Sequence, residues 1–256
     1  MMDRENMSGS GKSQQLFCSF CYSPKNGENK TMLRSQLLEA LSKYILEKSR
    51  DHPIRVAIDG LDNAGKSKLA KELIFPLRKS KRQIINISID GFHHPKKYRY
   101  RRGEYSPEGY YYDSFNLESI ITNVLEPLSP EGNRQFRRQI FDYTTDQKVE
   151  SEWETAEEDA ILLFDGLFLQ RQELDPFWDI RIFIDIDQDV SLDRAFERDL
   201  HYYHSLENIH KKYQLRCFPA HQIYLERCHP LQHADVIIEN NDWQKPTLTF
   251  QREVAG

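Results

Sequence analysis

From residue 53 onward, the apolar positions alternate between a strand-like and a helix-like spacing. Compact apolar runs predict buried strands at 54–59, 83–90, 159–166, 180–186 and 234–240, with a weaker candidate at 138–143. Between these runs, the apolar spacing predicts helices at 66–77, 117–125, 190–203 and 206–228. Since strands that alternate with helices form right-handed βαβ units, we expect a three-layer α/β fold around a central parallel sheet.

The first 52 residues follow a different pattern. Residues 1–30 are rich in Ser, Lys, Asn and Gly with little periodic apolar signal, and we expect a mobile N-terminal extension there. Between 31 and 52, leucines recur at helical spacing and predict one amphipathic N-terminal helix. Residues 53–256 would then form the main domain.

Composition narrows the class of protein. The 256 residues include 39% apolar and 29% charged side chains, which suffices for one sizeable core. A formal charge of −5 argues against a general nucleic-acid binder. The longest apolar runs are far shorter than the roughly 20 residues of a membrane span, and the N-terminus lacks the apolar stretch of a signal peptide. With only four cysteines, we expect a reduced, cytoplasmic protein that binds neither membrane nor nucleic acid.

One loop carries a complete G-x-x-x-x-G-K-S motif, between the strand at 54–59 and the helix at 66–77. In this setting the glycines let successive N–H groups curve around a phosphate, and the helix adds its positive end. Lys66 would reach the β- and γ-phosphates of ATP and Ser67 would bind Mg²⁺. The alternative is a chance glycine-rich turn. The expected ATP-binding residues are Gly60, Asp62, Asn63, Ala64, Gly65, Lys66, Ser67 and Lys68.

Two acidic residues end predicted strands and should meet at the same edge of the sheet. Asp165, in AILLFDG, would be a second holder of Mg²⁺, unless it merely caps the next turn. Asp90, at the end of QIINISID, could accept the proton of an attacking hydroxyl. An Asp before a Gly is equally typical of a turn former.

These motifs together resemble the uridine kinase and phosphoribulokinase family. The resemblance covers most of residues 53–242. It is carried by IDGLDNAGKS, SIDGFH, YYDSFN, FDY, LLFDGLF, an arginine-containing helix at 191–199 and ADVII. Pantothenate kinases are similar over 90–115 as well, so the motifs specify the family more closely than the substrate.

The resemblance implies roles by position. Asp90 would be the base, with His93 beside it in the acceptor site, and Asp113 would hold ribose hydroxyls, because a carboxylate accepts two hydrogen bonds. Phe141 and Tyr143 match aromatic residues that line the acceptor ring, although ordinary strand core explains them equally well.

The family's lid is expected on the helix at 190–203. Arg194 and Arg198 lie four residues apart, hence on one helix face, and would clamp the phosphates during transfer. The alternative is a solvated face on which both arginines pair with neighbouring acids.

The acceptor indicated first is uridine or cytidine, attacked through its 5′-hydroxyl. One departure concerns Asp146, which stands where uridine kinases carry a pyrimidine-reading His. Pantothenate or a sugar phosphate are alternatives, since the basic run at 96–102 would suit an anionic group. That run is expected to cover the acceptor pocket rather than bind nucleic acid. A rival from another class of protein is a regulatory protein gated by ATP. The sequence leaves open whether the chain forms a homo-oligomer.

Overall fold

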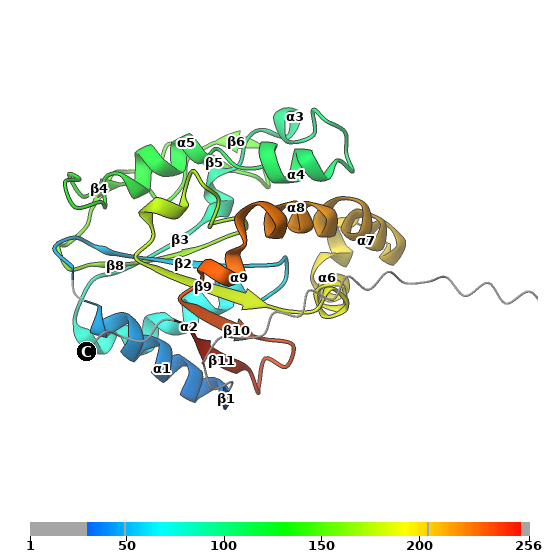
Figure 1. The fold of residues 1–256 in the computed structure, drawn as a ribbon. Helices are drawn as coiled ribbons and strands as arrows, with labels where there is room; N and C mark the ends of the chain where they lie inside the picture. Colours follow the sequence, from blue (N-terminus) through cyan, green and yellow to red (C-terminus); the bar gives the residue numbers. More distant parts are fainter. Residues whose placement is uncertain (1–29, 49, 204, 252–256) are drawn as a thin grey trace, which may run out of the picture.

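A seven-stranded sheet lies at the centre of the computed structural model, which describes residues 30–48, 50–203 and 205–251 (Figure 1). Its order is β1-β11-β10-β9-β2-β8-β3. The strands are β1 (Lys30–Thr31), β2 (Ile54–Gly60), β3 (Ile84–Ser88), β8 (Ile161–Asp165), β9 (Ile180–Asp185), β10 (Val236–Glu239) and β11 (Thr247–Phe250). The five strands from β10 to β3 are parallel, and β11 and β1 add antiparallel pairs at one edge.

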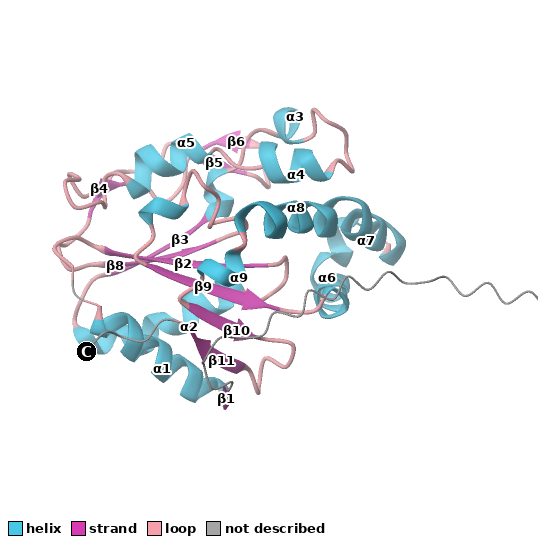
Figure 2. Cartoon of the chain, in the orientation of Figure 1, coloured by secondary structure: helices cyan, strands magenta, loops and turns pink. Residues whose placement is uncertain are grey.

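Helices cover both faces of the sheet, which gives the expected three layers (Figure 2). On one face, α1 (Arg34–Glu47) and α2 (Lys66–Leu77) pack over β2, β9 and β10. The other face carries α4 (Pro107–Asp113), α5 (Leu117–Ile120), α8 (Phe218–Cys228) and α9 (Pro230–His233). A helical hairpin of α6 (Gln188–Tyr203) and α7 (Leu206–Lys212) projects beyond the carboxyl end of β9.

Shorter elements complete the chain. The helical turns are η1 (Arg78–Ser80), η2 (Ile89–Phe92), α3 (Lys96–Arg99), η3 (Ile121–Leu125), η4 (Asp175–Phe177) and η5 (Tyr213–Cys217). Two small hairpins pair β4 (Gln135–Phe136) with β7 (Glu154–Thr155), and β5 (Phe141–Asp142) with β6 (Gln147–Lys148). Among the described helices, none is both long and apolar enough to cross a membrane.

Several elements differ from the sequence-based expectation. The second strand ends at Ser88, and Asp90 lies in the following η2 turn. The predicted strand at 138–143 shrinks to β5, which pairs outside the central sheet. The helix predicted over 206–228 contains the π-helical turn η5. The expected extension at 1–30 lies outside the described residues except for Lys30, which belongs to β1.

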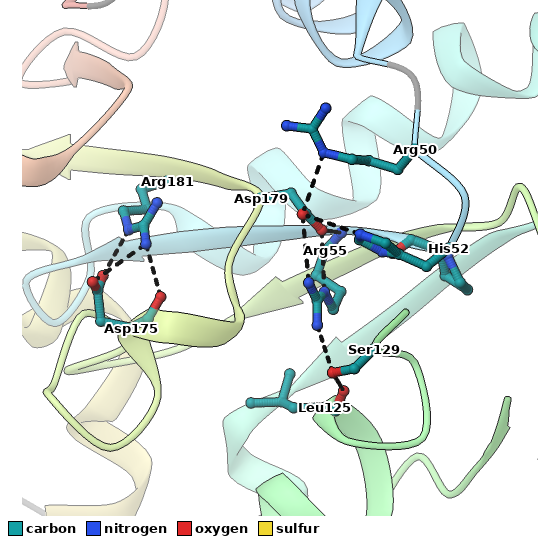
Figure 3. A network of polar contacts seen from close by, with 9 residues as sticks. Arg50, His52, Arg55, Leu125, Ser129, Asp175, Asp179 and Arg181 are labelled. Atoms are coloured by element: carbon teal, nitrogen blue, oxygen red, sulfur yellow. Dashed lines mark hydrogen bonds and ion pairs between the residues drawn. The ribbon is translucent and has the colours of Figure 1, made fainter. Parts of the chain in front are cut away.

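The amino ends of β2 and β9 are tied together by a polar network at the opposite edge of the sheet from the loop at 60–67 (Figure 3). Asp179, whose side chain is 10% exposed, accepts hydrogen bonds from the backbone N–H of Arg55 at 2.9 Å and from its Nε at 3.1 Å. Arg55 also donates to Ser129 Oγ at 2.7 Å, and His52 and Arg50 approach Asp179 at 3.7 Å. The network therefore joins the segment after α1 to β2, the start of β9 and the turn after η3.

Candidate active site

The G-x-x-x-x-G-K-S loop has the backbone geometry of a phosphate cradle. Gly60 and Gly65 adopt φ values of +145° and +96°, a region that side chains disfavour. A Cβ at Gly60 would also collide with the carbonyl oxygen of Ile184 in β9. The loop then enters α2 at Lys66, so the helix N-terminus and the curved backbone converge on one point, as anion binding requires.

Lys66 lies across this loop. Its Nζ donates to the carbonyl oxygens of Gly60 at 3.1 Å and Leu61 at 2.7 Å. Burial lowers the pKa of the ammonium, while the carboxylates around it, with Asp62 contributing most, act in the opposite direction. The lysine is thus held at the cradle, where phosphate oxygens could replace the two carbonyls.

Ser67 and Asp165 meet beneath the cradle. The Ser67 hydroxyl donates to Asp165 Oδ2 at 2.5 Å, and Ser88 Oγ lies 3.3 Å from the same oxygen. Asp165 is buried at the end of β8, and burial raises its pKa. Hydroxyl and carboxylate oxygens are the ligands that Mg²⁺ prefers, so these residues fit the expected ion.

Arg194 and Arg198 share a cavity of about 250 Å³ with the cradle residues. Arg194 donates to the carbonyl oxygen of Asn63 at 3.1 Å and to that of Asn240 at 2.7 Å, so it joins α6 to the cradle. Arg198 instead pairs with its neighbour Asp199 at 2.6 Å and stays 60% exposed. The structure therefore brings both arginines to the expected phosphate site, one fixed to backbone and one held by an acid.

Asp90 lies at the same edge of the sheet, and more than half of its side chain is exposed. Partial desolvation by the surrounding protein raises the pKa of Asp90; the charge of Asp165 adds to this, and that of Lys66 opposes it. His93 Nε2 is 4.0 Å from Asp90 Oδ1. Burial, aided by the charge of Arg99, lowers the pKa of His93 to about 3, so its ring stays neutral.

A second cavity, of about 340 Å³, opens beside Asp90. Its wall includes Phe141 and Tyr143, the two aromatic residues singled out from the sequence. The ring of His93 packs against two aromatic rings, with its centroid 5.0 Å from that of Tyr143 and 4.6 Å from that of Phe115. Asp90 therefore lines this cavity and is also close enough to the cradle to interact with the charges of Lys66 and Asp165.

Asp113 has both carboxylate oxygens occupied. Its side chain is buried at the end of α4, and it accepts hydrogen bonds of 2.7 Å from Arg101 and from Arg102. Burial alone would raise the pKa of Asp113, but these two hydrogen bonds lower it overall. The basic run at 96–102 thus covers Asp113 directly, and ribose hydroxyls would have to displace these arginines.

Asp146, at the position of the family's His, also has a defined partner. It adopts a left-handed backbone conformation and accepts a 2.7 Å hydrogen bond from the N–H of Lys96 and a 3.3 Å one from Arg99. The side chain therefore fixes α3 onto the β5–β6 hairpin.

Some contributors were missed from the sequence. Asn240, just after β10, donates to the carbonyl oxygen of Ala64, and its own buried Oδ1 accepts no bond from the described residues. Asp59 is fully buried below the cradle, where it accepts from the Gly60 N–H and the Tyr224 hydroxyl; burial raises its pKa to about 6. A polar residue after a parallel strand is the signal that could have identified Asn240.

Residues 56–245 match the phosphoribulokinase / uridine kinase family. The chain belongs to this family. It is 24% identical over 218 residues to the uridine kinase of Brevibacillus brevis, covering 80% of this chain and 93% of that one. It is 27% identical over 188 residues to uridine-cytidine kinase B of Dictyostelium discoideum, covering 73% and 74%.

Among solved structures, a possible uridine kinase from Bacillus stearothermophilus superposes with a TM-score of 0.63 at 25% identity. The match covers 79% of this chain and 97% of that one. Membership of the family makes this chain a P-loop kinase, a class that uses ATP and Mg²⁺.

Proposed function

We propose that the chain transfers the γ-phosphate of ATP to the 5′-hydroxyl of uridine or cytidine, with Asp90 as base. The observation that carries this proposal is the position of Asp90. It lines the 340 Å³ cavity and also interacts with the charges of Lys66 and Asp165 on the cradle side. A hydroxyl bound in that cavity could lose its proton to a carboxylate facing the phosphate.

In the proposed reaction, the acceptor oxygen forms a bond to the γ-phosphorus as its proton passes to Asp90. The bond from that phosphorus to the bridging oxygen breaks, and ADP leaves. Lys66, Arg194 and Arg198 would stabilise the negative charge of the transferring group. Mg²⁺, held by Ser67 and Asp165, would neutralise charge on the β- and γ-phosphates when bound.

A pyrimidine nucleoside is favoured by the aromatic lining of the cavity and by the uridine and uridine-cytidine kinases among the relatives. Phe141 is buried in the wall of the cavity, and Tyr143, which also lines it, is 43% exposed and could contact a bound ring. Stacking against an aromatic face suits a planar base.

A second candidate function is phosphorylation of an anionic metabolite, such as a sugar phosphate or pantothenate. It is favoured by Arg101 and Arg102, whose side chains remain 45% and 47% exposed after pairing with Asp113. Each guanidinium keeps unused N–H donors that could bind a phosphate or carboxylate.

Measuring ADP release from Mg·ATP with uridine, cytidine, pantothenate and sugar phosphates would separate these candidates. We expect uridine or cytidine to give the highest kcat/KM. Lys66→Ala should remove most of the turnover, while Lys43→Ala, on the exposed side of α1, should match the unmodified protein. ADP release that no acceptor stimulates would instead favour an ATP-gated regulatory protein.

A further inference from the structure

The π-helical turn η5 interrupts the long helical segment between α7 and α8. Wide turns of this kind insert one residue into a helix, change the direction of the side chains around it and are frequent at functional sites. Here the turn brings two buried polar side chains, Tyr213 and Arg216, to different parts of the molecule. Neither has a part in the proposed chemistry.

Tyr213 contacts the nucleotide side. Its hydroxyl accepts a hydrogen bond from Asn63 Nδ2 in the cradle at 2.9 Å. The same hydroxyl donates to Asp199 on α6 at 3.1 Å, the acid that also holds Arg198. One oxygen atom therefore joins the cradle to the helix that carries the proposed phosphate-clamping arginines.

Arg216 contacts the acceptor side. Its guanidinium donates to four carbonyl oxygens, one at the end of α3 and three in the segment after it: Arg99 at 3.2 Å, Gly103 at 3.4 Å, Glu104 at 3.0 Å and Ser106 at 3.1 Å. Only 2% of the residue is exposed. Since a guanidinium carries five donors in a rigid fork, it can hold a loop by its backbone in a way that an ammonium cannot.

The segment held in this way, residues 99–106, includes both partners of Asp113. Arg216 also lies over the rings of Tyr100 at 4.6 Å and Tyr110 at 5.1 Å. Tyr110 in turn donates its hydroxyl to Asp62 of the cradle at 2.8 Å. Two sets of contacts thus connect the acceptor segment to the cradle, and both include Arg216. One runs from Arg216 through Tyr110 to Asp62. The other runs from Arg216 along η5 to Tyr213 and Asn63.

We propose that Tyr213 and Arg216 are positioning residues that couple the nucleotide site to the acceptor segment at 99–106. This inference rests on the proposed function, since it requires a nucleotide in the cradle. Binding of the nucleotide changes the surroundings of Asn63 and α6, and η5 transmits the change to the backbone that Arg216 holds. The acceptor site is then completed only when the phosphate donor is present.

Hydrogen–deuterium exchange of residues 97–106, with and without Mg·AMP-PNP, tests the coupling without any knowledge of the acceptor. In the unmodified protein, we expect the nucleotide to slow exchange there by about fivefold or more, the range of typical couplings between sites. Arg216→Lys keeps the charge but loses the fork, and should remove this response while AMP-PNP affinity changes only a few-fold. Tyr213→Phe should weaken the response in the same way.

Arg181→Lys is the matched control, because this arginine also donates to a backbone carbonyl oxygen, that of Asp175 at 2.8 Å, but lies at the amino edge of the sheet (Figure 3). In the Arg181→Lys variant, Mg·AMP-PNP should slow exchange at residues 97–106 as much as it does in the unmodified protein. Should Arg216→Lys fail to fold, Tyr213→Phe decides the matter, since it removes a single hydroxyl. An unmodified protein that binds AMP-PNP without slower exchange at 97–106, or a full response in a folded variant, would overturn the coupling. Failure of AMP-PNP to bind would instead contradict the proposed function.

Discussion

At the scale of single residues, the surroundings of Asp90 suit the role of base that we propose for it. It is exposed to a cavity that can hold an acceptor, yet its surroundings favour the neutral form. A base is most effective when its pKa lies near the working pH. The cleft therefore moves this carboxyl toward the range in which it can take and release a proton.

Replacing Asp90 by Asn preserves the shape of the side chain but removes the proposed proton acceptor. We expect kcat to fall by about 10²- to 10⁴-fold, the usual contribution of a general base, with ATP affinity nearly unchanged. Steady-state kinetics with the best acceptor and a direct nucleotide-binding assay would check both. Full activity of the variant would exclude Asp90 as the base.

The same residue predicts a pH dependence. Since the pKa of Asp90 is raised above its ordinary value of 3.8, the carboxylate proposed as the base is protonated as the pH falls through that raised value. The acid limb of kcat/KM should accordingly lie above 3.8. His93, with a pKa of about 3, stays neutral across this window. The residual activity of Asp90→Asn should lack this limb.

At the scale of elements, the five parallel strands could be predicted from the sequence, but the antiparallel strands β11 and β1 at one edge of the sheet could not. Most residues of β2, β8, β9 and β10 are buried, so short apolar runs dominate their sequences. β11 is the four-residue TLTF and β1 only two residues, too short for a periodic signal. Each is defined by its pairing partner, which no local pattern encodes.

Within the site too, some features could be predicted from the sequence and others could not. The cradle could be predicted because its glycines and lysine follow from local backbone geometry and a fixed motif. The pairing of Asp113 with Arg101 and Arg102 could not, because a basic run does not reveal which acid it will meet. η5 was hidden as well, since its apolar residues keep a nearly helical spacing.

The network at the amino edge of the sheet gives a prediction for stability. Asp179→Asn leaves the buried Arg55 without its charge partner and should cost about 3 kcal/mol of unfolding free energy. For a chain of this size, that corresponds to a melting temperature lower by roughly 6–12 °C. Asp159→Asn is the control, because its pairing with Arg82 is long, at 3.9 Å, and 64% of the acid is exposed. Equal losses in the two variants would contradict this role of the network.

At the scale of the whole molecule, the cradle links most of the architecture. It contacts β9 through Gly60, α6 through Arg194, α4 through Asp62 and the end of β10 through Ala64. A ligand in the cradle is therefore expected to stabilise the entire fold rather than one loop.

Unfolding should accordingly respond to nucleotide as a single transition. At a concentration of Mg·AMP-PNP about 100 times its Kd, the stabilisation is about 2.7 kcal/mol, and the melting temperature should rise by roughly 5–10 °C. Scanning calorimetry would show one shifted peak. Lys66→Ala should lose most of the shift, and a second, unshifted peak would mean that part of the chain unfolds independently.

The strand order also has a consequence for how the chain folds during synthesis. β2 emerges from the ribosome early, but its neighbours β8 and β9 follow only after residue 160, and Gly60 packs against Ile184. Such long-range pairings make folding slow, because a long loop must close before they form. The nascent kinase is thus expected to lack a nucleotide site until β9 has left the exit tunnel, so ATP cannot assist its early folding.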